Sequence, residues 1–172
     1  MTVTIRQLGL LPAEILETRK AFDCGQPALN SYLAQTALQH EVRNITRTFC
    51  AVKTDSISGY YSLTNAVVDV SALPPDVIKR YRLPTHALPV VRLARLAIAR
   101  QHQRQGLGGI LMIDAMRKVV SVSESSGCVG LVVDAKDAAA AQYYRGYGFH
   151  PAPENSRLLF MPLPAIKQLL AS

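Results

Sequence analysis

The chain has 172 residues, 49% of them hydrophobic, so it can bury a sizeable core without help from metals or disulfides. Its 19 Lys and Arg against 12 Asp and Glu give a net charge of +7, which suits an acidic partner, nucleic acid above all, and equally suits ordinary solubility. No apolar run approaches the roughly 18 residues of a membrane span, and no signal-peptide pattern is present. We therefore expect one domain over residues 1–172 and no membrane segment.

The cysteines point to a reducing compartment. Cys24, Cys50 and Cys128 are odd in number and far apart, without CxxC or metal-ligand spacing. Such a pattern is typical of reduced thiols in a cytoplasmic protein and predicts neither a disulfide framework nor a metal site.

Hydrophobic periodicity predicts alternating strands and helices. Strands are expected at 2–8, 46–53, 57–70, 90–99, 129–134 and 158–161. Helices are expected at 28–41, 107–123, 138–147 and 165–170. Segment 73–89 carries four prolines and is expected to be a mobile flap with at most a short basic helix. Antiparallel strands first and β-α-β units later indicate an α/β (α+β) fold, in which helices flank a mixed sheet.

The strand expected at 90–99 changes the phase of its pattern. Val91 and Leu93 are apolar at odd positions, whereas Leu96 and Ile98 are apolar at even ones. Such a change favours a β-bulge near Arg95, because a uniform strand would turn half of its side chains to the wrong face. A fully buried strand that contains two arginines remains the alternative.

Between this strand and the next helix lies a glycine turn, residues 103–108, that can cradle an anion. Unpaired amides at a helix N-terminus and the helix dipole both favour negative charge, and glycine lets a phosphate approach the main chain closely. A P-loop is excluded because no Gly-Lys-Ser/Thr follows, and the dinucleotide fingerprint lacks its third glycine, which is Leu111 here. A turn in which glycine is simple punctuation is the structural alternative.

This turn resembles the Q/R-x-x-G-x-G/A signature of the GNAT acetyltransferases, with Gln103, Gly106 and Gly108 at its fixed positions. Segment 138–149, AAAAQYYRGYGF, is similar to the end of the GNAT core. Segments 22–33, 46–49, 59–62 and 95–97 resemble, in order and spacing, the acetyltransferase toxins of type II toxin–antitoxin modules. The resemblance extends over nearly the whole chain.

The resemblance implies a GNAT acyl-CoA N-acyltransferase fold of six or seven strands, opened between strands 90–99 and 129–134 to admit acetyl-CoA. It also implies which residues bind acetyl-CoA: Leu96, Ala97, Ile98, Gln103, Arg104, Gln105, Gly106, Leu107, Gly108 and Gly109.

By the same resemblance, the hydroxyl of Tyr144 is the general acid that protonates the leaving thiolate. Its neighbour Tyr143 is expected to pack in the core. A general base is less evident: Asp134 ends a strand beside the expected gap, but it can equally begin the next loop, and the four histidines are isolated.

The toxin resemblance implies acetylation of the α-amino group of aminoacyl-tRNA, which blocks translation. A GNAT enzyme acting on a small amine or a protein amine, and a non-enzymatic anion-binding module, are the alternatives. An antitoxin of ribbon–helix–helix type and a homodimer are expected as partners. The expected tRNA-binding residues are basic: Arg43, Arg47, Arg80, Arg82, Arg92 and Arg95, the last of which can instead hold the strand bulge.

Overall fold

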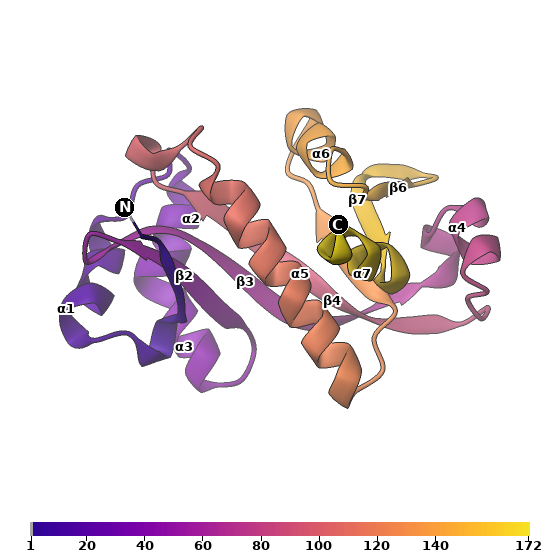
Figure 1. The fold of residues 1–172 in the computed structure, drawn as a ribbon, viewed down its shortest axis with the longest axis horizontal. Coiled ribbons are helices and arrows are strands. Elements are labelled where there is room, and N and C mark those ends of the chain that lie inside the picture. Colours follow the sequence, from indigo (N-terminus) through magenta and orange to yellow (C-terminus); the bar gives the residue numbers. More distant parts are fainter. Residues whose placement is uncertain (1) are drawn as a thin grey trace. The chain divides into compact units, whose positions relative to one another are not determined.

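The computed structural model describes residues 2–172, whose strands form a seven-stranded mixed sheet with the order β1-β2-β3-β4-β5-β7-β6 (Figure 1). The strands are β1 (Thr4–Gln7), β2 (Arg47–Lys53), β3 (Ser56–Asp69), β4 (Ala87–Ile98), β5 (Gly130–Asp134), β6 (His150–Ala152) and β7 (Asn155–Pro162). The helices are α1 (Ala13–Leu16), α2 (Pro27–Ser31), α3 (Ala37–Val42), α4 (Pro75–Arg80), α5 (Leu107–Ser125), α6 (Ala138–Arg145) and α7 (Leu163–Ala171). The expected α/β fold with a mixed sheet is thus confirmed.

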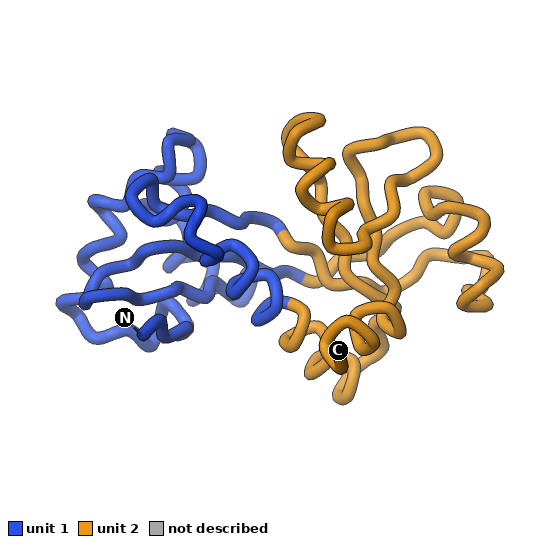
Figure 2. Tube along the Cα trace, turned by 45° about the horizontal axis from the view of Figure 1, so that its top comes forward, with its two compact units in different colours: residues 1–64, 94–115 blue, residues 65–93, 116–172 orange. Residues whose placement is uncertain are grey.

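The chain divides into two compact units (Figure 2). Unit 1 comprises Met1–Thr64 and Ala94–Ala115, and unit 2 comprises Asn65–Leu93 and Met116–Ser172. Three elements, β3, β4 and α5, contribute residues to both units. The single domain expected from the sequence stays a prediction.

In unit 1, one helical stretch runs from α2 through a π-helical turn, Tyr32–Thr36, into α3. Pro27 begins it, because a residue without an amide hydrogen loses nothing at the first position of a helix. Tyr32 and Leu33 are buried against β2 and β3 in the core of this unit. The expected helix at 28–41 is confirmed, whereas the π-helical turn was not foreseen.

A two-residue turn joins β2 to β3. Thr54 and Asp55 both have positive φ angles, 53° and 59°, and Lys53 pairs with Ser56 across the turn. This is the backbone of the tight hairpin turn that matches the twist of antiparallel strands. The strands expected at 46–53 and 57–70 are thus confirmed, and they pair antiparallel.

The core of unit 2 explains why segment 73–89 is not a free flap. Leu73 and Val77, each 2% exposed, pack in one cluster with side chains of the sheet. Val77 belongs to α4, which begins at Pro75. Leu88, also 2% exposed, lies in the same cluster, so the segment is anchored by apolar burial at three positions.

Two further features position the C-terminal half of unit 2. Helices α6 and α7 both pack on β7, and β6, which was not expected, pairs antiparallel with β7. Gly130 pairs with Pro162, and a Cβ at Gly130 would overlap the carbonyl oxygen of Met161.

Within residues 2–172, none of the helices has the length and apolarity needed to cross a membrane.

Strand β4 runs parallel to β5 through three residue pairs, of which Leu93 with Val133 is the last. Along β4 the buried residues alternate with more exposed ones. This alternation shifts by one residue at Val90 and Val91, which are both buried, and not at Ala94 and Arg95. Leu96 and Ile98 are half-buried, so the phase change read from the apolar residues lies four residues too late. The expected opening between the two strands stays a prediction.

Candidate active site

The turn between β4 and α5, in unit 1, has a backbone that leaves its outer side open. Gly106 lies in the left-handed region with φ of +84°, and Arg104 has φ of +62°. A Cβ built on Gly106 would meet no atom within 4 Å. The glycine is therefore required by backbone conformation rather than by crowding.

Three amides at the start of α5 face no acceptor within the helix. The first helical hydrogen bond after the turn runs from the Ile110 amide to the Gly106 carbonyl, at 3.2 Å. The amides of Leu107, Gly108 and Gly109 precede it. They stand at the positive end of a 19-residue helix. These residues fit a bound pyrophosphate, the part of acetyl-CoA that the sequence assigned to them.

The Gln103 side chain braces this turn instead of facing outward. Its Nε2 donates to the carbonyls of Cys24, at 3.0 Å, and Ile98, at 2.9 Å. Both hydrogens of the amide group are thus used inside unit 1. We therefore give Gln103 a positioning role: its side chain fixes the turn against the end of β4.

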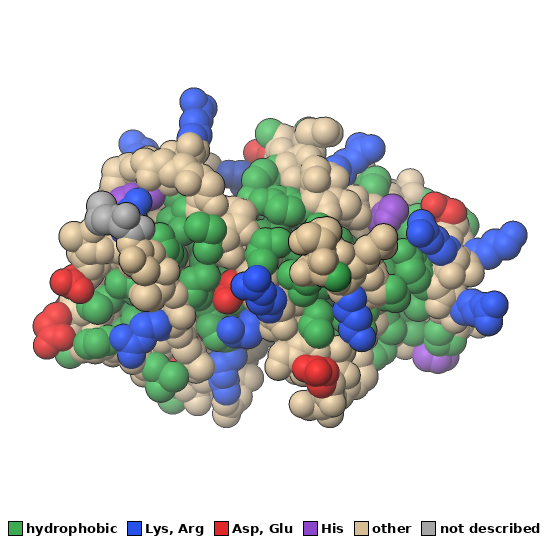
Figure 3. All heavy atoms as spheres, in the orientation of Figure 1, with side chains coloured by type: hydrophobic (Ala, Val, Ile, Leu, Met, Phe, Trp, Pro, Cys, Tyr) green, Lys and Arg blue, Asp and Glu red, His purple; other side chains and the backbone are tan. Residues whose placement is uncertain are grey.

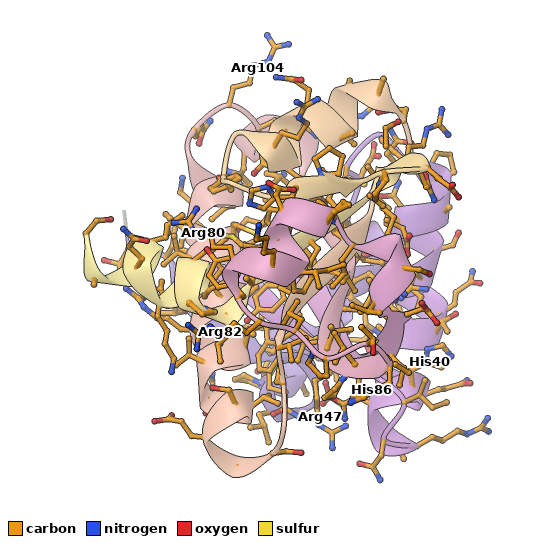
Figure 4. The ribbon with its side chains drawn as sticks, turned by 90° about the vertical axis from the view of Figure 1, so that its right-hand side faces the viewer. His40, Arg47, Arg80, Arg82, His86 and Arg104 are labelled. Atoms are coloured by element: carbon orange, nitrogen blue, oxygen red, sulfur yellow. The ribbon has the colours of Figure 1, made fainter. Side chains whose placement is uncertain are left out.

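The next two residues differ in how their side chains are held. Gln105 Nε2 donates to the Gln101 carbonyl at 3.1 Å. Arg104 is exposed, and its side chain extends away from the turn (Figure 4). Arg104 is therefore the side chain of this turn that can reach a phosphate oxygen.

Helix α6, in unit 2, carries the other group of residues that the sequence singled out. Asp137 caps it, since its Oδ1 accepts a hydrogen bond from the Ala140 amide at 2.8 Å. The Tyr144 ring contacts Tyr143 and Phe149 edge to face, with centroid separations of 5.4 and 5.8 Å. Burial raises the pKa of Tyr144 to about 12, so the phenol is protonated at neutral pH.

The Tyr144 hydroxyl has no hydrogen-bond partner within residues 2–172. The hydroxyl of Tyr60 donates to the Leu29 carbonyl at 2.8 Å, and that of Tyr61 to the Asp114 carboxylate at 2.5 Å. Both of these tyrosines are fully buried, and a buried tyrosine hydroxyl usually finds such a partner. The Tyr144 hydroxyl is therefore available to a substrate atom, as general-acid catalysis requires.

The carboxylate considered as a base is engaged. Asp134, at the end of β5, forms an ion pair with Arg92 of β4. Arg92 is correspondingly less available to nucleic acid than the sequence suggested. The histidines are scattered here too: His40 hydrogen-bonds to Tyr32, and His86 lies by the Ala87 carbonyl.

Four other arginines expected to bind tRNA are exposed, namely Arg43, Arg47, Arg80 and Arg82. Many further cationic side chains lie on the face in Figure 3. Arg47 also holds the end of α3, because it donates to the Glu41 carbonyl at 3.0 Å and to Asn44 Oδ1 at 2.7 Å. Arg80 and Arg82 flank Tyr81 at the end of α4 (Figure 4). A joint tRNA-binding rim made by these residues remains a prediction.

Arg95, on β4 in unit 1, differs from all of these. Its guanidinium carbon lies 3.4 Å from the centroid of the Tyr32 ring, in a cation–π contact. The residue is half-buried, and among residues 2–172 its N–H groups have no hydrogen-bond or ion-pair partner. Tyr32 belongs to the π-helical turn, a local irregularity that is frequent at functional sites and that hydrophobic periodicity does not reveal.

Comparison with known proteins decides the family. The model of the Acetyltransferase (GNAT) family matches residues 16–149. The chain belongs to the GNAT family. It is accordingly an acetyl-CoA-dependent N-acetyltransferase, and its seven-stranded mixed sheet is the GNAT fold.

The similar proteins include acetyltransferase toxins. A tRNA-acetylating toxin of Mycobacterium tuberculosis is 29% identical over 150 residues, which cover 87% of this chain and 89% of that protein. The structure of AtaT complexed with acetyl-methionyl-tRNAfMet has a TM-score of 0.87 and 33% identity, over 98% of this chain and 99% of that one. A tyrosine-to-phenylalanine mutant of AtaT, bound to acetyl-CoA and the C-terminus of the antitoxin AtaR, has a TM-score of 0.81 and 30% identity, over 99% of each chain.

Proposed function

We propose that this GNAT enzyme is a toxin that transfers the acetyl group of acetyl-CoA to the α-amino group of aminoacyl-tRNA and so blocks translation. The observation that carries the proposal is that the half-buried hydroxyl of Tyr144 can act as a general acid, whereas the nearby carboxylates in the sequence are already engaged and cannot act freely as a general base. In unit 2 the Tyr144 hydroxyl lacks a protein partner, whereas Asp134 is paired with Arg92 and Asp137 caps α6. The amine that receives the acetyl group must therefore be able to react without a general base from the protein.

An α-amino group meets this requirement better than a lysine side chain does. Its pKa of about 7.7–8.0 leaves much of it neutral near physiological pH, whereas a lysine at about 10.4 needs a base. Esterification to tRNA lowers the amine's pKa further, because the ester withdraws electrons. The names of the tRNA-acetylating toxin and of the AtaT complex support the same acceptor.

The reaction then needs little covalent help from the protein. The neutral amine attacks the thioester carbonyl carbon, a C–N bond forms and the C–S bond breaks. Tyr144 donates its proton to the departing sulfur, and the proton that the amine loses passes to solvent. In this proposal the amides of Leu107, Gly108 and Gly109 hold the pyrophosphate, and β4 from Leu96 to Ile98 lies along the pantetheine arm.

The substrate contacts are proposed to be the arginines named from the sequence, with Arg95 foremost. Stacking on Tyr32 fixes the plane of its guanidinium and leaves the N–H edge free for ester, ribose or phosphate oxygens. The exposed residues Arg43, Arg80 and Arg82 are proposed to contact phosphates. Arg92 is proposed to contribute less to tRNA binding, because it is held in an ion pair with Asp134.

The proposed partners are a second copy of this chain, with which it forms a homodimer, and an antitoxin of ribbon–helix–helix type. The structure of AtaT bound to the C-terminus of AtaR supports an antitoxin partner. Because charged tRNA is the substrate, the proposed location is the cytoplasm.

The test is to incubate the protein with labelled acetyl-CoA and, in separate reactions, total charged tRNA, deacylated tRNA, and a lysine-containing peptide. We expect label on charged tRNA alone, and alkaline release of labelled N-acetyl amino acids from it. Tyr144→Phe serves as the low-activity control. Ready labelling of the peptide, with every charged tRNA left unmodified, would refute the proposal.

A further inference from the structure

A group of aromatic rings on α6 is not used by the mechanism above. Tyr143, expected in the core, is 42% exposed. Its ring contacts the rings of Tyr144 and Tyr147 edge to face, at 5.4 Å in each case, and its hydroxyl lies 3.3 Å from that of Tyr147. Burial and the Tyr147 hydroxyl raise the pKa of Tyr143, so its ring is neutral and can stack.

The charges around this helix favour a negatively charged ligand. The two acids that flank the start of α6 are engaged, Asp134 with Arg92 and Asp137 with the Ala140 amide. Lys136 and Arg145 are exposed and form no ion pair within residues 2–172. An exposed aromatic ring on a helix, with unpaired cations on the same helix and in the loop before it, is a combination that can bind a nucleotide by base stacking and phosphate contact.

We propose that Tyr143 is a stacking platform for the terminal adenine of the aminoacyl-tRNA. This inference rests on the proposed function, whose substrate it places on α6. Only a few bonds join the reacting α-amino nitrogen, through the ester and the ribose, to that adenine. The platform ring directly contacts the ring of Tyr144, the proton donor, and so lies within this short reach.

The adenine of acetyl-CoA offers the same chemistry but fits this place less well. The full pantetheine arm and the pyrophosphate separate that adenine from the sulfur that Tyr144 protonates. An adenine ring beside the Tyr144 ring is therefore better supplied by the aminoacyl-tRNA than by acetyl-CoA.

The experiment uses charged tRNA with 2-aminopurine in place of the terminal adenine, since its fluorescence is quenched when it stacks on an aromatic ring. We expect quenching with the wild-type protein and with Tyr143→Phe, which keeps the ring, and no quenching with Tyr143→Leu. Loss of one base–aromatic contact should also raise KM for charged tRNA about tenfold in Tyr143→Leu, with kcat little changed.

Two further measurements separate the possible failures. Acetyl-CoA and acetyl-pantetheine, which lacks adenine, are titrated into each variant, and Tyr143→Leu should bind both as the wild type does. Weaker binding of acetyl-CoA alone would assign the platform to the cofactor's adenine and overturn the inference. If quenching persists in Tyr143→Leu while charged tRNA is still acetylated, the stacking platform is refuted and the proposed function stands. If the wild-type protein acetylates no charged tRNA, the platform and the proposed function are both refuted.

Discussion

Replacing Tyr144 with phenylalanine removes one hydroxyl and leaves the ring in its contacts with Tyr143 and Phe149. Because that hydroxyl has no protein partner within residues 2–172, its loss should leave folding unchanged. General acids typically contribute about 10²–10⁴-fold to a rate, most when their pKa lies near the working pH. Burial holds the pKa of Tyr144 at about 12, so we expect the lower end, about 10²-fold in kcat, or about 2.7 kcal/mol.

The raised pKa of Tyr144 also fixes the shape of the pH profile. The acid must be protonated to act, and raising its pKa from 10 to about 12 extends the protonated form to higher pH. The kcat/KM of the wild type should therefore rise with pH as the amine loses its proton, and then stay level without an alkaline decline near pH 10. Single-turnover acetylation of charged tRNA, timed to be short against ester hydrolysis, measures both effects.

Tyr143→Phe is the matched control, because it removes a hydroxyl from the adjacent residue and keeps its ring. Its kcat should stay near that of the wild type. If the rate loss fell on Tyr143→Phe instead, or if both variants lost little, the assignment of Tyr144 would be refuted. An alkaline decline near pH 10 in the wild type would contradict the buried environment of its phenol.

The remaining predictions concern cofactor binding, stability and reactivity. Gly106→Ala forces a side chain into φ of +84° and should weaken acetyl-CoA binding measured by calorimetry, whereas Gly106→Asn, which tolerates this conformation better, should retain more affinity. Asp137→Ala removes the cap of α6 and should lower the free energy of unfolding by about 1 kcal/mol in urea titration; no change would show that the cap is dispensable. Gly130→Ala overlaps the Met161 carbonyl and should destabilise more strongly than Asp137→Ala, in the same assay. Cys50 is fully buried and its pKa is raised to about 12, so a thiol reagent at pH 8 should modify Cys128 first, and early modification of Cys50 would contradict this burial.

The sequence predicted well those features that local chemistry determines. The two strands that became β2 and β3, the helix at 138–147 and the long helix after the glycine turn were all foreseen, because each depends on residues close together in the chain. The strand β6 was missed because three residues carry too little alternation to be recognised.

Side-chain partners in the candidate site could not be predicted, because they depend on contacts between distant segments. The Gln103 amide was assigned to phosphate from its place in the motif, but it bonds to the carbonyl of Cys24, 79 residues away. The same holds for Arg92, which pairs with Asp134 on another strand. Tyr143 was placed in the core by helical position alone, and only the packing of α6 shows that it is exposed.

The division of the chain into two interleaved units has a consequence for its synthesis on the ribosome. Unit 1 needs residues up to Ala115, whereas unit 2 needs the chain up to Ser172, so unit 1 can close while much of unit 2 is still unmade. A nascent chain at that stage already has the turn at Gly106 that is proposed to bind phosphate, but it lacks Tyr144. Chains that end between Ala115 and Tyr144 would therefore hold this turn without the proposed general acid.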